Sequence, residues 1–188
     1  MMIFILYYFI LPLLTVALIA FLKSPMVKGF LGELVISICL MFLDTGKYKV
    51  LNDIMIPSGD LPDPSDPSTA DRTSQIDHII VSIYGIFVIE TKNFKGAIYG
   101  SENDFKWTQV ISRKQKYRFY NPILQNKGHV KSLQNLPGNH FPSIKYIPIV
   151  VFTSRADFKK LNVTSHVVYS INLLKTIKMY TRRNISPR

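Results

Sequence analysis

The sequence offers almost no thiol chemistry, because Cys39 is the only cysteine among 188 residues. A single thiol cannot form an internal disulfide, and without a cysteine cluster the chain cannot build a thiolate zinc site. A glycine-rich phosphate loop, a dinucleotide-binding fingerprint and a nucleophilic triad motif are also missing. These absences exclude a zinc ribbon and argue against ATP-driven or hydride-transfer chemistry.

Charge is distributed unevenly along the chain. Residues 1–22 carry no charged side chain, and from Lys106 to Arg188 Asp157 is the only acid against 16 Lys and Arg. The formal net charge of +11 therefore comes from the second half. A dense basic surface fits a polyphosphate backbone or an anionic membrane leaflet, and a solvated surface of a basic protein is equally compatible with it.

The uncharged N-terminus predicts a membrane anchor. Ile3–Leu22 supplies about the 20 apolar residues that a helix needs to cross the hydrocarbon of a bilayer. A cleaved signal peptide usually opens with Lys or Arg and has a shorter apolar core, so an anchor is favoured. The first charges after it are Lys23 and Lys28, and the positive-inside rule then places the C-terminal body in the cytoplasm. We expect residues 1–24 to form one single-pass transmembrane helix and 25–188 to form one domain.

Hydrophobic periodicity in residues 25–188 predicts an α/β fold with a mixed sheet. The expected helices are Pro25–Leu43, Asn121–Leu136 and Ile171–Tyr180. The expected strands are Tyr48–Ile56, Thr73–Ser82, Gly85–Asn93, Ala97–Gly100, Tyr146–Thr153 and Ser165–Tyr169. The second and third strands, joined by Ile83-Tyr84, predict a hairpin. We expect Pro57–Arg72 to be a solvated loop and the stretch that ends at Trp107 to be irregular, while Pro148 predicts an edge or unpaired start for its strand.

Three charged side chains, Asp77, Glu90 and Lys92, fall on the two strands of the predicted hairpin. Glu90 and Lys92 share a face of their strand, and a suitable hairpin register brings Asp77 opposite Glu90. Two carboxylates on apolar strands favour a hard cation between them, and a neighbouring lysine can orient water. This is a minimal arrangement for phosphodiester hydrolysis. A plain ion pair of Glu90 with Lys92 on an edge strand is the alternative.

Five linked motifs resemble the nuclease-related domain (NERD) family, a branch of the PD-(D/E)xK nuclease superfamily. They are Lys28-Gly29-x-x-Gly32-Glu33, Thr73-x-Gln75-Ile76-Asp77-His78, Gly85-Ile86-Phe87-Val88-Ile89-Glu90-Thr91-Lys92-Asn93 with Gly96, Trp107, and Asn121-Pro122-x-x-Gln125-Asn126. The resemblance covers about Lys28–Leu136. It implies a restriction-endonuclease-like core, a mixed central sheet flanked by helices, behind the anchor.

The resemblance also implies roles for individual residues. Asp77 and Glu90 would bind Mg²⁺ or Mn²⁺, Lys92 would position the attacking water, and Glu33 would be an auxiliary acid. Gln125 resembles a glutamine that some relatives carry near the active site. The chain departs from its relatives at two positions. Ile76 precedes Asp77 where proline is usual, and His129 stands where relatives with Q-x-x-x-Y have tyrosine.

A run of cations with aromatics predicts contacts to nucleic acid. Arg113, Lys114, Lys116 and Arg118 alternate with tyrosine and phenylalanine, a composition suited to phosphate contact and base stacking. Contact with anionic lipid headgroups is the alternative. Taken together, the sequence favours a membrane-anchored, metal-dependent nuclease acting on nucleic acid, with DNA expected. A non-catalytic module that tethers nucleic acid or a partner to the membrane is the alternative, and a membrane protein with a decayed site is a third.

Overall fold

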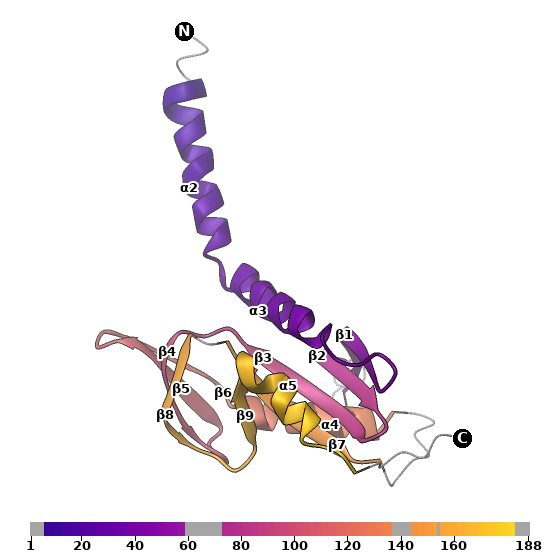
Figure 1. The fold of residues 1–188 in the computed structure, drawn as a ribbon. Helices are drawn as coiled ribbons and strands as arrows, with labels where there is room; N and C mark the ends of the chain where they lie inside the picture. The colour runs from indigo at the N-terminus through magenta and orange to yellow at the C-terminus, as the bar shows by residue number, and fades with distance from the viewer. Residues whose placement is uncertain (1–5, 59–72, 137–143, 154, 183–188) are drawn as a thin grey trace, which may run out of the picture.

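The computed structural model describes residues 6–58, 73–136, 144–153 and 155–182 (Figure 1). The protein has a mixed α/β fold in which two mixed β-sheets and four α-helices are described. Most of the predicted loop Pro57–Arg72 lies outside the described residues.

The first sheet carries the predicted hairpin. Its strands are β1 (Tyr48–Pro57), β2 (Thr73–Ser82), β3 (Gly85–Lys92), β7 (Tyr146–Phe152) and β9 (His166–Tyr169), in the spatial order β1-β2-β3-β7-β9. Strands β2 and β3 are antiparallel, with Ser82 paired to Gly85 across a two-residue turn. Gly85 has a φ of 134°, a conformation that a side chain disfavours. The hairpin prediction is therefore confirmed.

Strand β7 explains how a proline fits inside this sheet. It runs parallel to β3 along its whole length, and Pro148 pairs with Val88. The pairing between β7 and β9 begins only at Ile149. Proline has no amide hydrogen to donate, and among the described residues β9 does not pair with the strand at this position. The predicted unpaired start of this strand is confirmed on its β9 side.

Three helices cover the first sheet. Helices α3 (Pro25–Leu40) and α5 (Ser170–Lys178) pack together on it, and α4 (Pro122–Gln134) packs against β2, β3 and β7 (Figure 1). The α3 and α5 cluster includes the buried side chains of Ile36, Leu40, Phe87, Ile149, Leu173 and Ile177. The α4 cluster includes Ile76, Ile79, Val88 and Leu133.

The second sheet corrects the sequence prediction. It consists of β4 (Gly96–Ser101), β5 (Lys106–Ser112), β6 (Gln115–Tyr120) and β8 (Ala156–Asn162), in the order β6-β5-β4-β8. Only the first of these strands was expected. Strands β5 and β6 are rich in polar and charged residues, so they lack the apolar run that marks a buried strand. Trp107 anchors the sheet from inside β5, fully buried and stacked on Phe152.

The N-terminal segment differs from the expected single span. It consists of a π-helix, η1 (Leu6–Ile10), followed by α2 (Leu11–Leu22), and the change occurs next to Pro12, which has no amide hydrogen to donate. Within the described residues, no single helix is both long enough and apolar enough to cross a membrane. Tyr7–Leu22 and Pro25–Leu40 meet that test only as a pair, bent by 55°.

Candidate active site

The hairpin register brings the two predicted carboxylates together. His78 pairs with Ile89, so the next positions along the two strands are Asp77 and Glu90. The Asp77 Oδ2 atom accepts a 2.6 Å hydrogen bond from the Thr91 amide, which fixes this carboxylate against β3. Asp77 therefore lies beside Glu90 on the same face of the sheet, as strand periodicity predicts.

Lys92 joins the carboxylate pair to helix α4. Its Nζ atom lies 2.6 Å from Glu90 Oε1 and donates a 3.1 Å hydrogen bond to Gln125 Oε1. Gln125 is on the first turns of α4, 33 residues further along the chain. Four of the five residues predicted for catalysis are thus adjacent: Asp77, Glu90, Lys92 and Gln125.

His129 is a member of the site that sequence reasoning noted only as a departure. Its Nε2 atom lies 3.1 Å from Glu90 Oε2, and its Nδ1 atom lies 2.6 Å from the Ser74 hydroxyl. His129 follows Gln125 by four residues, so the two side chains share one face of α4. That spacing was the available signal, and it would have placed the histidine beside the glutamine.

Burial and repulsion shape the electrostatics of the pair. Glu90 is 2% exposed. Burial raises the pKa of Asp77 to about 7, and the nearby Glu90 charge adds to this effect, while the Thr91 hydrogen bond opposes it. The ionised form of Asp77 is therefore costly in the protein as it stands. A cation beside Asp77 would offset that cost.

Glu33 reaches the site from α3, which approaches β3 unusually closely. A Cβ atom at Gly32 would lie 2.6 Å from Asn93 Cβ, so glycine permits this contact. Asn93, directly after β3, links this strand to α3, because its Nδ2 atom donates a hydrogen bond to the Lys28 carbonyl. Its Oδ1 atom accepts a hydrogen bond from the Thr153 hydroxyl. Glu33, one residue after Gly32, lines the same cleft as Asp77 and Glu90.

The two asparagines of the last motif, Asn121 and Asn126, have structural roles. Asn121 caps α4 by accepting from the Ile123 amide, and its Nδ2 atom donates to carbonyls of the loop before β5. Asn126 is fully buried and donates to the carbonyls of Val88 and Ile149. These bonds hold the start of α4 on the sheet, and they thereby place Gln125 and His129 beside Glu90.

The site opens into a cleft of about 640 Å³ between the two sheets and α3. Its cations besides Lys92 are Lys28, Lys95 and Arg155, none of which the sequence singled out as a nucleic-acid contact. Their positive charge suits a phosphate backbone.

The predicted nucleic-acid run lies mostly outside this cleft. Arg113 and Lys114 are at the turn between β5 and β6, and Lys116 and Arg118 are exposed on β6. Of this run, Tyr117 lines the cleft. Because neighbouring strand residues point to opposite faces, Lys116 and Arg118 lie on the other face of the second sheet.

The carboxylates of the site supply some, but not all, of the ligands that a hard divalent ion needs. Asp77 and Glu90 offer carboxylate oxygens, and Mg²⁺ commonly binds proteins through one or two carboxylates together with water and substrate phosphate. The buried, repelling pair supports this fit. In the part of the chain that the structure describes, however, no group of three or more His, Cys, Asp or Glu is arranged to hold a metal.

His78 follows Asp77 in β2, so strand alternation directs it to the opposite face of the sheet. It points away from the carboxylates, is 1% exposed and contacts Asn52 Oδ1 at 2.9 Å. Burial lowers its pKa to about 4, so the ring is neutral near pH 7. It is a core histidine.

Comparison with known proteins identifies the family of the chain. Residues 28–153 match the family model of the nuclease-related domain. An uncharacterised protein of Bacillus anthracis is 38% identical over 162 residues, which cover 84% of this chain and 69% of that protein. No solved structure matches the chain significantly. The chain therefore belongs to the nuclease-related domain family.

Proposed function

We propose that the protein is a divalent-metal-dependent nuclease that hydrolyses phosphodiester bonds of nucleic acid, with DNA as the expected substrate. The observation that carries the proposal is the adjacency of Asp77, Glu90 and Lys92 in a cleft that Lys28, Lys95 and Arg155 also line. Family membership supports a nuclease-related function.

Each residue has a task in this proposal. Asp77 and Glu90 would bind Mg²⁺ or Mn²⁺, which would supply charge stabilisation at the scissile phosphate and an activated water. Lys92, held between Glu90 and Gln125, orients the attacking water by hydrogen bonding. Glu33 assists from the α3 side of the cleft.

The positioning of Glu90 depends on helix α4. Its Oε1 atom contacts Lys92 and its Oε2 atom contacts His129, which is on α4. The Ser74 hydroxyl fixes the other ring nitrogen of His129. His129 is a positioning residue, and it substitutes here for the tyrosine that the family resemblance led us to expect.

One observation favours the alternative, a non-catalytic binding module. Lys92 and His129 already contact both oxygens of Glu90, so this carboxylate has partners without a metal. Such a module would bind nucleic acid in the cleft and would need no divalent ion.

A cleavage assay separates the two functions. The full chain in detergent is incubated with plasmid, single-stranded DNA or RNA in the presence of Mg²⁺, Mn²⁺ or EDTA. We expect cleavage that requires metal, that is lost in Asp77→Asn, and that persists in Lys49→Ala, an exposed lysine on β1. Salt-dependent binding without cleavage under every metal would establish the binding module instead.

The proposal includes a membrane anchor formed by α2, with the domain facing the cytoplasm. All described side chains of α2 are exposed, and the segment carries no charge. Figure 1 shows α2 extending away from the two sheets. An uncharged helix whose side chains are all exposed is best accommodated in lipid.

A further inference from the structure

Helix α3 is apolar on both of its faces. The inner face, with Ile36 and Leu40, is buried on the first sheet. The opposite face, which we call the outer face, is exposed and includes Met26, Phe30, Leu34, Ile38 and, in the turn after the helix, Met41 and Phe42. Phe30 is 62% and Met41 79% exposed. A helix that is hydrophobic all round is normally covered on all sides.

The outer face continues the apolar surface of α2. The two helices are separated only by Lys23 and Ser24, and the chain bends by 55° between them. A transmembrane helix is tilted by about 20° on average, so a bend of this size can carry α3 to within roughly 15° of the membrane plane. Lys23, at the bend, would then lie at the level of the lipid headgroups.

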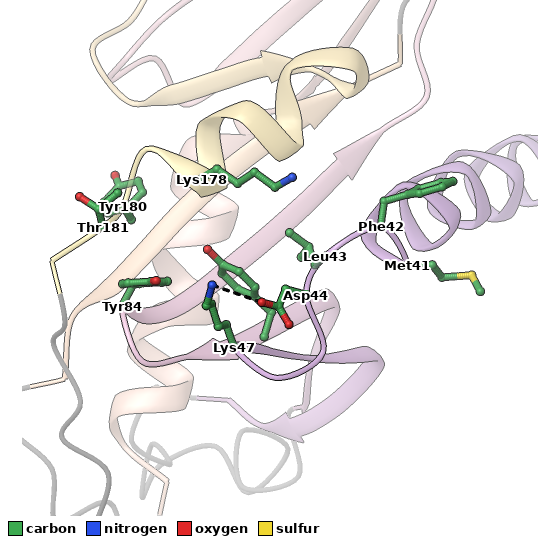
Figure 2. A pocket seen from close by; sticks show the side chains of 10 residues that line it. Met41, Phe42, Leu43, Asp44, Lys47, Tyr84, Lys178, Tyr180 and Thr181 are labelled. Carbon is green, nitrogen blue, oxygen red and sulfur yellow. Dashed lines mark ion pairs between the residues drawn. The ribbon is translucent and has the colours of Figure 1, made fainter.

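A pocket of about 410 Å³ lies at the C-terminal end of the outer face. Figure 2 shows Phe42 and Met41 on one side of it and Tyr84, Tyr180 and Thr181 on the other. Lys178, from the end of α5, extends over the pocket toward Leu43 (Figure 2). Lys47 is also present and pairs with Asp44 at 3.3 Å. Apolar side chains next to cations and tyrosines are typical of surfaces at a membrane interface.

We propose that the outer face of α3 docks the domain on the same bilayer that α2 enters, with Lys178 beside the headgroup of an anionic phospholipid. The inference rests on the proposed anchor. Lipid is the occupant because the outer face is continuous with the uncharged α2 and ends in a basic pocket.

Docking would fix the orientation of the candidate active site. The first turns of α3 contribute Pro25 and Lys28 to the rim of the cleft, and the same helix carries Glu33. If α3 lies on the bilayer, the cleft opens beside the membrane surface. Nucleic acid would then be bound close to the lipid headgroups.

Fluorescence quenching by brominated lipids tests the docking directly. The full chain is reconstituted in vesicles of phosphatidylcholine and phosphatidylglycerol with brominated acyl chains. Tryptophan replaces Phe30 or Phe42 on the outer face, and Phe9→Trp reports on the anchor. Phe105→Trp is the matched control, because Phe105 is 66% exposed but lies beside Tyr120 and the start of α4. The buried Trp107 gives a common background.

We expect quenching of Phe30→Trp and Phe42→Trp by about half, because an interfacial helix buries its apolar face 5–10 Å into the headgroup and acyl boundary. Phe105→Trp should remain unquenched. Quenching of Phe9→Trp without quenching of the α3 probes would leave the anchor intact and overturn the docking. Absence of quenching at Phe9→Trp would remove the anchor and the docking together. A blue shift of the α3 probes without quenching would mean that protein, a partner or a second copy, covers the face, and would also overturn it.

The lipid class is tested with the same probe. Quenching of Phe42→Trp should weaken when phosphatidylglycerol is omitted, and it should weaken similarly in Lys178→Gln with phosphatidylglycerol present. Lys106→Gln, a charge change at an exposed position on β5 of the second sheet, should leave it unchanged. Equal quenching in both lipid mixtures would overturn the assignment of Lys178 to an anionic headgroup.

Discussion

At the scale of single residues, the site combines positions that the sequence reveals with positions that it hides. The spacing of two between Glu90 and Lys92, and the hairpin that brings in Asp77, could be predicted because strand periodicity is local. His129 lies 39 residues from Glu90 in the chain. Its contact depends on how α4 crosses the sheet, which no local pattern specifies.

The raised pKa of Asp77 leads to a prediction about stability. In the metal-free protein at pH 8, Asp77→Asn should raise the free energy of unfolding by about 2 kcal/mol, because it removes a buried charge that Glu90 repels. The asparagine oxygen can still accept from the Thr91 amide. Thermal unfolding in EDTA measures the effect.

The same variant should lose any stabilisation by Mg²⁺, whereas the unaltered protein should gain stability as Mg²⁺ is added. A thermal unfolding midpoint in EDTA that is lower for Asp77→Asn than for the unaltered protein would contradict the assignment of Asp77 as a metal ligand. An undiminished stabilisation of the variant by Mg²⁺ would contradict it as well.

Glu102 predicts a pH dependence of the opposite sign. Burial would raise its pKa, but hydrogen bonds from the side chain and amide of Ser165 and the amide of Thr164 outweigh this and lower the pKa to about 2. Its stabilising contribution is therefore present above the ordinary value of 4.5 and is lost as pH falls toward 2. Urea unfolding should show Glu102→Gln less stable than the unaltered protein at pH 7, with the difference shrinking below pH 4.5. A difference in stability that does not change between pH 7 and pH 4 would contradict this role of Glu102.

At the scale of elements, the first sheet and its helices could be predicted and the second sheet largely could not. Strands β2, β3 and β7 are rich in β-branched residues, which mark them clearly. Strand β6 (QKYRFY) has five of its six side chains exposed, so its sequence lacks the alternation of apolar and polar residues that marks a strand. The extended basic run was recognised by composition, but its faces are set by the register with β5.

The two glycines of the first motif allow a paired test of how α3 packs. Gly32→Ala should destabilise the protein by about 1–3 kcal/mol, since the added methyl would meet Asn93 Cβ at 2.6 Å. Gly29→Ala should stabilise it by about 0.5–1 kcal/mol, because nothing lies within 4 Å of that position and alanine favours a helix. Urea unfolding of both variants gives the comparison. Equal effects would mean that α3 does not approach β3 as described.

At the scale of the whole molecule, the uneven distribution of charge and hydropathy was visible in the sequence, whereas the geometry was not. The uncharged N-terminus and the basic second half are properties of composition. The bend of 55° between α2 and α3 is not, although Ser24 and Pro25 mark it as a helix start. Both helices were expected from the sequence, but the bend, which gives them different surroundings, was not.

The proposed orientation predicts the location of the C-terminus. A reporter that is active only in the cytoplasm, fused after Arg188, should be active, because Lys23, Lys28 and the basic domain follow α2. A second fusion before Met1 should be inactive. Activity of a fusion at Arg188 that works only outside the cytoplasm would contradict the orientation.

The central claim is that Lys92 acts in phosphodiester hydrolysis and not in binding. The most direct measurement compares cleavage and affinity for the same nucleic acid in Lys92→Ala and the unaltered protein, with Mg²⁺ present. We expect cleavage to fall by about 100-fold or more, on the scale of a side chain positioned to act on the attacking water, with little change in affinity. Cleavage at the unaltered rate by Lys92→Ala would contradict it.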